Sequence, residues 1–268
     1  MKFLQCGHDK SGTYLLYKIL SLAQKQTRHY KSFMQRSGVG TIIDTHLSRT
    51  KRYPEVNEVD HIRRTGDTWT LNFPSPICRH IPLDINLLIN TSSLVYTHEK
   101  PSRLQPFRDR FTHRYYLIRD GRDVINSLMH FLTDDISRQL VPEYKISDPQ
   151  VLYNDLEYFS RLVTKWAEHV SDYLQHAEDY ILIHFEQLSK NPLVVLDQIK
   201  SETGLDFDFG RITEETSFGH MKQTAPAHLR KGRAGDWRNY FSARHKEIFK
   251  AIAGHMLTHF EYEPTMEW

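Results

Sequence analysis

Cysteine is scarce in this chain, which has only Cys6 and Cys78 among its 268 residues. Two thiols exclude a disulfide-stapled scaffold, and because they form no CxxC pair they argue against a structural zinc site. Long apolar runs are also lacking, since none approaches the ~18 residues that a membrane span requires. The opening residues MKFLQCGHD are too short and too polar for a secretory signal. We therefore expect no membrane span, no bound metal and a reducing, cytoplasmic location.

Charge of one sign is not in excess either. The 35 basic and 33 acidic residues leave a formal net charge of +2, so the molecule as a whole is not built to bind polyanions such as nucleic acid. Any basic site must be local. With 39% hydrophobic and 25% charged residues, the chain can bury a sizeable core. We expect one domain over residues 1–268.

Short apolar segments alternate with segments of helical periodicity along most of the chain. The expected strands cover residues 2–6, 93–98, 113–119 and 179–185, and the expected helices cover residues 12–25, 122–132, 148–176, 192–203 and 244–257. This alternation favours an α/β fold with a mainly parallel central sheet flanked by helices. Residues 30–90 fit the pattern less well. Apart from possible strands at 40–46 and 68–73, we expect a loop-rich insertion there that shapes the acceptor pocket.

The segment GHDKSGTYLL, residues 7–16, joins the first expected strand to the first expected helix. Backbone N–H groups and the helix dipole at such a junction bind anions, and this mixture of glycine, lysine and hydroxyl residues is typical of a phosphate-binding loop. The order differs from the common nucleotide loop GxxxxGK[ST], because Lys10 precedes Gly12. A purely structural turn between strand and helix is the alternative interpretation.

A second segment, YLIRDGRDVINS, places Arg119 at the end of an expected strand and Ser127 eight residues later in the next helix. A guanidinium offers a bidentate fork to a phosphate, and a hydroxyl adds one more donor. The alternative is an ordinary ion pair of Arg119 with Asp120 or Asp123.

The most specific signal is LRKGRAGDWRNYF at residues 229–241. Arg230 and Lys231 supply positive charge, and Gly232 allows the backbone to approach a phosphate closely. A charge run is usually a solvated surface, but this one carries glycine and tryptophan at fixed spacing. Just upstream, TSFGHMK at residues 216–222 combines hydroxyl, aromatic and thioether groups.

Together these four segments resemble the nucleotide-binding motifs of sulfotransferases that use 3'-phosphoadenosine 5'-phosphosulfate (PAPS), the cytosolic type in particular. The family reads PKSGTTW where this chain has residues 9–15, and TSFxxMK at residues 216–222. It reads RKGxxGDWKNxF at residues 230–241, where only Arg238 departs, conservatively, from the fixed positions. The motifs occur in the family's order. The resemblance implies a P-loop NTPase-like sulfotransferase fold.

The resemblance also implies which residues bind the donor PAPS and its product PAP. The 5'-phosphosulfate would lie on Lys10, Ser11, Gly12, Thr13 and Tyr14, and the 3'-phosphate on Arg119, Ser127, Arg230, Lys231 and Gly232. The nucleoside would meet Phe185, Thr216, Phe218 and Met221. Phe185 stands where the family has a tyrosine, so it keeps a ring for stacking and loses the hydroxyl. Core packing is the alternative role for Phe185 and Met221.

Sulfuryl transfer needs in-line positioning, charge stabilisation at the leaving oxygen and a base for the acceptor's proton. The resemblance places Lys10 at the bridging oxygen. The family's base is a histidine in KTHLP, some twenty residues before the motif arginine. VYTHEKP puts His98 twenty-one residues before Arg119, and we favour it because an imidazole titrates near neutral pH. His46 in IIDTHLS lies too early in the chain, and Glu99 is a third candidate.

The acceptor stays open between a small molecule and a glycan or lipid, with a hydroxyl or an amine receiving the sulfuryl group. An apolar cavity would use Tyr30, Phe33, Tyr53, Trp69 and Phe73, whereas an anionic or sugar acceptor would meet Arg49, Lys51, Arg52, Arg63 and Arg64. The family's dimerisation pattern KxxxTVxxxE is degraded here to Arg238, Ser242, Ala243 and Glu247. Monomer and homodimer are therefore both open.

Two other functions compete with sulfuryl transfer. A kinase-like P-loop enzyme would need a lysine after the second glycine and an acidic magnesium ligand on a strand, and the sequence offers neither pattern. A non-catalytic binder of nucleotides or polyanions would use the RTKR and RKGR patches. It would bind in a salt-sensitive way without preferring PAPS.

Overall fold

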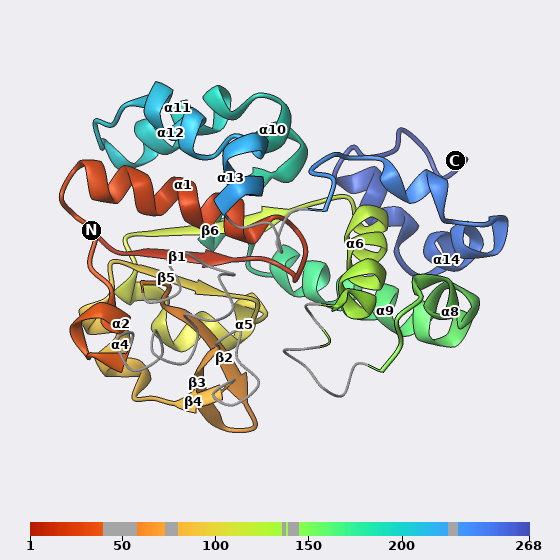
Figure 1. Cartoon of the computed structure of the whole chain (residues 1–268), viewed down its shortest axis with the longest axis horizontal. Helices are drawn as coiled ribbons and strands as arrows, with labels where there is room; N and C mark the ends of the chain where they lie inside the picture. Colours follow the sequence, from red (N-terminus) through yellow and green to blue (C-terminus); the bar gives the residue numbers. More distant parts are fainter. Residues whose placement is uncertain (40–57, 73–79, 136–137, 139–144, 225–229) are drawn as a thin grey trace.

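The computed structural model describes residues 1–39, 58–72, 80–135, 138, 145–224 and 230–268. Within these residues, seven strands form one sheet in the order β4-β3-β2-β5-β1-β6-β7. The strands are β1 (Phe3–Cys6), β2 (His61–Thr65), β3 (Thr68–Asn72), β4 (His80–Pro82), β5 (Leu94–Thr97), β6 (His113–Ile118) and β7 (Ile181–His184). Figure 1 shows this sheet between two groups of helices.

The sheet is mainly parallel, as the alternation of strands and helices predicts. β1 lies between β5 and β6 with Phe3 opposite Leu94 and His113, and all these pairings are parallel. β7 continues the parallel part beyond β6, and β2 continues it beyond β5. Only the edge formed by β3 and β4 runs antiparallel to its neighbours among the described strands. The α/β fold with a mainly parallel sheet is confirmed.

Helices cover both faces of the sheet because side chains of a strand point alternately to opposite sides. Phe3 of β1 packs in the cluster with α1 and α10–α12, whereas Leu4 and Cys6 pack in the cluster with α6, α8, α9 and α14. The first group comprises α1 (Thr13–Gln26), α10 (Phe185–Lys190), α11 (Pro192–Thr203) and α12 (Phe209–Glu215). The second comprises α6 (Gly121–Thr133), α8 (Pro149–Asn154), α9 (Leu156–Leu174) and α14 (Ala243–His259). The remaining described elements are α2 (Phe33–Arg36), α4 (Ile85–Thr91), α5 (Pro101–Leu104), η1 (Gln105–Arg110), η2 (Ala177–Asp179), α13 (Phe218–Thr224) and η3 (Asp236–Asn239).

One expected helix is wrong in its continuity. Residues 148–176 do not form a single helix, because Asp155 leaves the helical conformation and accepts a hydrogen bond from the backbone N–H of Tyr158. A side chain that caps a new helix start competes with continuation of the old one. The segment therefore divides into α8 and α9.

The described parts of residues 30–90 contain more regular structure than the loop-rich insertion that we expected. The strand expected at 68–73 is confirmed as β3, but β2 and α4 were not expected. The strand expected at 40–46 lies outside the described residues. Trp69 packs edge-to-face on Phe107, with ring centroids 5.9 Å apart, so this aromatic contributes to the core on the α9 side.

The carboxyl ends of β1, β5, β6 and β7 meet at one edge of the sheet because these strands are parallel. The segments that follow them are residues 7–12, 98–100, 119–120 and the start of α10. Ligands of open α/β sheets bind outside this edge. Among the described helices, none is long and apolar enough to cross a membrane.

Candidate active site

The loop after β1 has the backbone shape of an anion-binding turn. Lys10 and Gly12 both adopt left-handed conformations, with φ of 68° and 92°, and α1 begins directly afterwards. A β-carbon on Gly12 would lie 2.3 Å from the ring of Phe185, so only glycine fits between the loop and α10. The left-handed Lys10 is uncommon for a residue with a side chain, and such strain gathers at functional sites.

Arg119 connects this loop to two other predicted segments. Its Nη1 donates to the carbonyl oxygen of Lys10 at 3.0 Å, and its Nη2 donates to the carbonyl of Arg233 at 3.5 Å. The guanidinium carbon lies 4.3 Å from the centroid of the Phe185 ring, a cation–π contact. Its Nε is buried without a hydrogen-bond partner among the described residues. Arg119 is thus held in place with donor capacity left for a ligand.

The ammonium of Lys10 lies over the ring of Phe131, 4.1 Å from its centroid. Burial lowers the pKa of Lys10 to about 8, and the nearby guanidinium of Arg119 acts in the same direction. A cation held among other cations is stabilised by an incoming anion. The loop is therefore electrostatically prepared for a phosphate or sulfate group.

The RKG segment is organised by two buried carboxylates. Asp236 accepts from Arg230 at 2.6 Å and from Lys231 at 2.9 Å. Burial would raise the pKa of Asp236, but these two cations hold it well below its usual range. Asp123 on α6 accepts from the backbone N–H of Gly235 at 2.6 Å and of Trp237 at 3.2 Å. The acidic residues position the basic ones beside α6.

The chain's last residue reinforces the same segment. The guanidinium of Arg122 lies between the rings of Trp237 and Trp268, 4.2 Å and 4.5 Å from their centroids. Arg122 also pairs with Asp120 at 2.7 Å and is almost fully buried. The sequence patterns did not single out Arg122 or Trp268 and named Asp123 only as a possible ion-pair partner of Arg119, because nothing local marks these long-range contacts.

The remaining predicted nucleotide residues are only partly brought together. Phe218 is 45% exposed, and its ring lies so close to Gly232 that a β-carbon there would be 2.3 Å away. Thr216 ends α12 and donates its hydroxyl to the carbonyl of Ile212. The other positions are Ser127 on α6, half-buried; Tyr14 on α1, stacked on Tyr17; Ser11 and Thr13, buried in the loop; and Met221 on α13, buried.

His98 lies at the end of β5 with both ring nitrogens engaged. Its Nδ1 is 2.9 Å from the carbonyl oxygen of Gly7, and its Nε2 is 2.8 Å from the hydroxyl of Tyr96. A carbonyl can only accept, so Nδ1 carries the hydrogen and Nε2 of the neutral ring is the basic nitrogen. The Tyr96 hydroxyl also meets Thr13 at 2.9 Å. His98 is thereby connected to the phosphate loop.

Glu99 and His46 are the two alternatives to His98 as the base. Glu99 is only 9% exposed, and its carboxylate accepts from the backbone N–H of Arg64 at 2.9 Å and from Arg103 at 2.8 Å. These contacts tie Glu99 to β2 and α5 as a structural residue. His46 lies outside the described residues.

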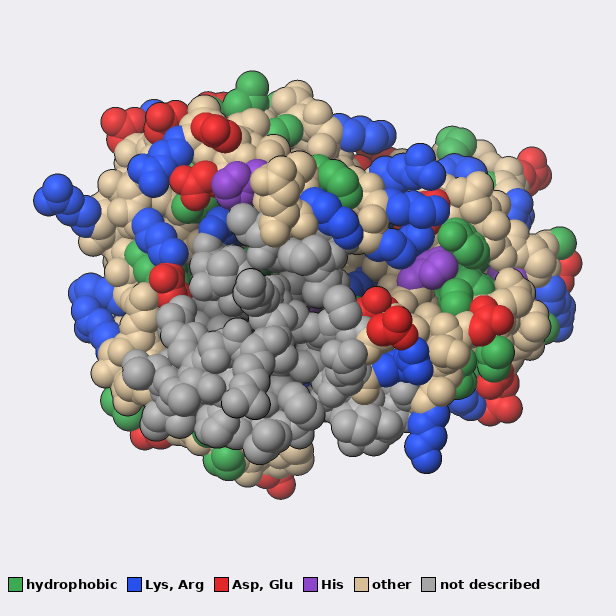
Figure 2. All heavy atoms as spheres, viewed as in Figure 1, with side chains coloured by type: hydrophobic (Ala, Val, Ile, Leu, Met, Phe, Trp, Pro, Cys, Tyr) green, Lys and Arg blue, Asp and Glu red, His purple; other side chains and the backbone are tan. Residues whose placement is uncertain are grey.

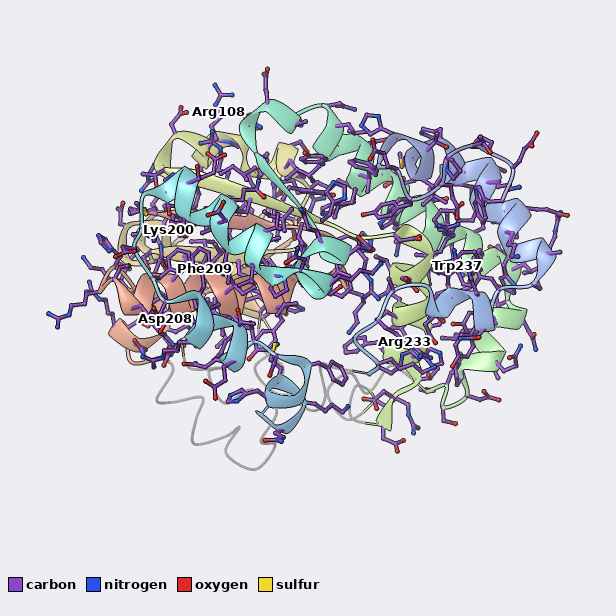
Figure 3. The ribbon with its side chains drawn as sticks, turned by 90° about the horizontal axis from the view of Figure 1, so that it is seen from above. Arg108, Lys200, Asp208, Phe209, Arg233 and Trp237 are labelled. Atoms are coloured by element: carbon purple, nitrogen blue, oxygen red, sulfur yellow. The ribbon has the colours of Figure 1, made fainter. Side chains whose placement is uncertain are left out.

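The surface agrees with a local basic site. Figure 2 shows Lys and Arg side chains gathered at the upper right of one face, where Figure 1 places the loop before α14. Figure 3 labels Arg233 and Trp237 in this region, far from Lys200 and Asp208 at the other end.

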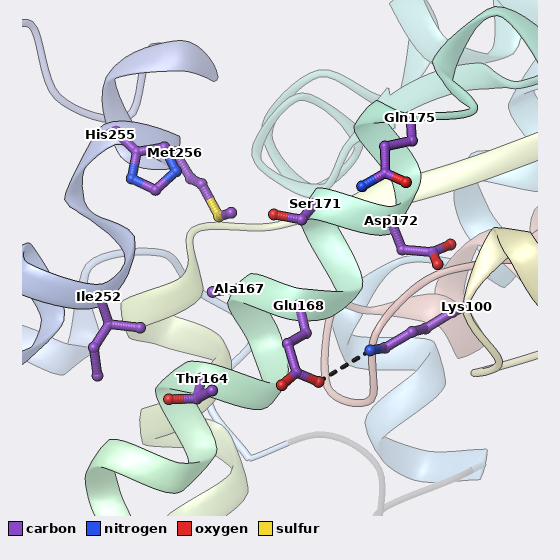
Figure 4. A pocket seen from close by; sticks show the side chains of 10 residues that line it. All are labelled: Lys100, Thr164, Ala167, Glu168, Ser171, Asp172, Gln175, Ile252, His255 and Met256. Atoms are coloured by element: carbon purple, nitrogen blue, oxygen red, sulfur yellow. Dashed lines mark hydrogen bonds and ion pairs between the residues drawn. The ribbon is translucent and has the colours of Figure 1, made fainter.

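A separate cavity of ≈ 380 Å³ lies between α9 and α14, where Lys100 pairs with Glu168 at 3.0 Å (Figure 4). No group of acidic, histidine or cysteine side chains in the described parts is arranged to hold a metal.

The family model of the sulfotransferase domain matches residues 2–261. The chain belongs to the sulfotransferase domain family. Sulfotransferase 1B1 of Mus musculus is 28% identical over 193 residues, covering 63% of this chain and 62% of the mouse protein. The 3-beta-hydroxysteroid sulfotransferase of Cavia porcellus is 25% identical over 184 residues, covering 59% and 61%. These alignments span about three fifths of the relatives' own length.

Solved sulfotransferase structures share the fold over nearly the whole chain. Mouse sulfotransferase SULT7A1, complexed with PAP, has a TM-score of 0.61 at 18% identity, and the match covers 99% of this chain and 87% of the mouse chain. Retinol dehydratase in a complex with retinol and PAP has a TM-score of 0.58 at 18% identity, with 96% and 81% coverage. The P-loop NTPase-like sulfotransferase fold that the motifs imply is confirmed.

Proposed function

We propose that this sulfotransferase transfers the sulfuryl group of PAPS to a hydroxyl or amine and releases PAP. The observation that carries the proposal is the convergence of three separate motifs on Arg119. Its guanidinium contacts the phosphate loop at Lys10, the ring of Phe185 and the RKG segment at Arg233. A nucleotide with phosphates at both the 5' and 3' positions explains why two basic segments lie side by side. The related structures of mouse SULT7A1 and retinol dehydratase contain PAP, which supports the same donor.

The phosphate loop, the basic residues and His98 then have separate chemical tasks. Backbone N–H groups of residues 11–14 hold the nonbridging oxygens, and Lys10 stabilises the charge that develops on the bridging oxygen. Arg119, with Arg230 and Lys231, binds the 3'-phosphate. The Nε2 of His98 takes the proton of the acceptor. Such chemistry rests on positioning and charge, and no protein-bound metal is assigned to it.

Isothermal titration calorimetry with PAP tests the donor. We expect PAP to bind far more tightly than AMP or ATP, because neither control carries a 3'-phosphate for the arginine segments. Replacing Arg230 by alanine should weaken PAP binding by about 10-fold or more, the value of one charge-assisted hydrogen bond. Arg211→Ala removes the same charge from an exposed ion pair on α12 and should leave PAP affinity unchanged. Equal affinity for PAP and ATP would reject PAPS as the donor.

The affinity for PAP should depend on pH through Lys10. The pKa of this amine is about 8, so its charged form is lost as the pH rises above that value, and a bound phosphate favours the charged form. We expect PAP affinity to fall by roughly tenfold per pH unit above pH 8.5. Lys10→Arg should bind PAP without this fall, because a guanidinium stays charged. A wild-type affinity constant from pH 7 to 10 would contradict the placement of Lys10 at the 5'-phosphate.

The acceptor is proposed only as a class. The related proteins include a 3-beta-hydroxysteroid sulfotransferase and a retinol dehydratase in complex with retinol, which suits a small apolar molecule bearing a hydroxyl. Of the aromatics predicted to line an apolar cavity, Tyr30 instead donates to the carbonyl of Glu58 and Trp69 packs in the core. A cytoplasmic location stays a prediction.

A further inference from the structure

Asp9 occupies a position where a negative charge is unexpected. The family motif PKSGTTW begins with proline, and this chain has aspartate there, directly before Lys10. A carboxylate in a loop that receives a phosphate would repel the ligand unless something else uses its charge. Asp9 must therefore have a partner that makes its charge an advantage.

The structure provides that partner in His98. The carboxylate Oδ1 of Asp9 lies 3.3 Å from Nε2 of His98, the basic nitrogen of the ring. Since Nδ1 of His98 faces the carbonyl of Gly7, the ring cannot turn over without losing a hydrogen bond. A proton that arrives on Nε2 consequently finds a carboxylate within reach.

Other charged and titratable groups surround the pair from several elements. They are His8 from the loop, His61 and Arg63 from β2, Tyr96 from β5, His169 from α9, and Lys10 on the other side of Asp9. Burial lowers the pKa of His169 to about 3 and also lowers the pKa of His8. These two imidazoles are therefore neutral at neutral pH, and the ring nitrogen that faces the Asp9 carboxylate is Nε2 of His98.

These surrounding groups change the pKa of the Asp9 carboxyl group. Burial alone would raise the pKa of Asp9, but the positive groups around it together outweigh this effect. His98, followed by His8 and Arg63, holds the pKa of Asp9 well below its usual range. Asp9 is ionised whenever the enzyme works near neutral pH.

We propose that Asp9 is a positioning residue that holds the imidazolium formed when His98 accepts the proton of the acceptor group. In this step the acceptor oxygen forms the new O–S bond, and its proton moves to Nε2 of His98. The bond between sulfur and the bridging oxygen breaks, and its electron pair stays on the 5'-phosphate of PAP. The resulting Nε2–H donates to the Asp9 carboxylate, which already lies 3.3 Å from this nitrogen. This role rests on the proposed function, in which His98 is the base.

Tyr96 explains how the same nitrogen is held before the reaction. In the neutral ring Nε2 accepts from the Tyr96 hydroxyl, and that oxygen in turn accepts from Thr13. The motif KTHLP has lysine at the position of Tyr96. Both departures from the family, Asp9 and Tyr96, thus contact the one basic nitrogen of His98.

Carbon-13 NMR of the aspartate carboxyls tests the pair without any donor or acceptor. Asp9→Asn identifies the Asp9 resonance, and a pH titration of the wild type should give a midpoint below the ordinary aspartate range. In His98→Gln this midpoint should rise by about 1–3 pH units, because the neighbouring cation is gone. His176→Gln is the matched control, since His176 faces Asp172 at 4.0 Å elsewhere. An Asp9 titration unchanged in His98→Gln overturns the proposal.

Kinetics with PAPS and 2-naphthol separates positioning from a structural role. Asp9→Asn should lower kcat about tenfold or more with little change in the KM for PAPS, and Asp9→Glu should restore part of the loss. In the His98→Gln background the same substitution should cost nothing further, because the two residues act as a unit. Full additivity, or a loss confined to KM, contradicts the proposal. If His98→Gln keeps the wild-type rate, the proposed base fails, while the NMR titration still reports whether the pair exists.

Discussion

Replacing His98 by alanine should lower kcat by about 10²–10⁴-fold, which is what a positioned base contributes. The affinity for PAP should stay within about twofold of the wild type, because His98 contacts the phosphate loop at the carbonyl of Gly7 and the carboxylate of Asp9, and neither group is placed at a phosphate. Initial rates with PAPS and a panel of phenols, alcohols, amines and sugars measure the first effect. Calorimetry with PAP measures the second.

The matched variant is His46→Ala, which removes the competing Thr-His pair of the sequence. We expect it to retain catalysis, because His46 lies far too early in the chain to end the strand beside the phosphate loop. His98→Ala with a wild-type rate, combined with a loss in His46→Ala, would move the base to residues 40–46. Loss of PAP binding in His98→Ala would instead mean that the ring supports the loop.

The parts of the fold that could be predicted are those where the local pattern and the packing agree. β1 is buried over its whole length, and β6 is buried from Tyr115 to Ile118, because helices cover both faces of the sheet. α11 carries its own signals, with Pro192 at the start and Gly204 after the end. β2 was missed because His61–Thr65 is a polar segment in which only Ile62 is fully buried. Its strand conformation comes from pairing with β3 and β5, which the local sequence does not encode.

In the candidate site, too, the residues marked by a local sequence pattern could be predicted, and the long-range contacts between them could not. The phosphate loop, Arg119 and the RKG segment are recognisable because glycine and basic residues recur at fixed spacing. The contacts that position them join residues far apart in the chain, such as Asp123 with Gly235 and Arg122 with Trp268. Asp9 was visible only as a departure from the motif. Its meaning depends on a histidine eighty-nine residues away that β-sheet pairing brings beside it.

Arg119 carries the second large expected effect. Replacing it by alanine should weaken PAP binding by about 10–150-fold, the range for a hydrogen bond to a charged group. The loss should exceed that of Arg230→Ala, since Arg230 is 32% exposed and shares Asp236 with Lys231. Arg119 is half-buried and also fixes the phosphate loop through the carbonyl of Lys10.

Arg119→Lys should not restore binding, because a single ammonium cannot reach the carbonyls of Lys10 and Arg233 while also contacting a phosphate. Arg108→Ala is the control, as this exposed arginine pairs with Asp179 and lies at the other end of the molecule from Arg233 (Figure 3). PAP affinity should be unaffected there. If Arg119→Lys bound PAP as the wild type does, the planar fork would be dispensable. The 3'-phosphate would then rest on Arg230 and Lys231 alone, and the convergence of the three motifs on Arg119 would be a packing feature of the fold.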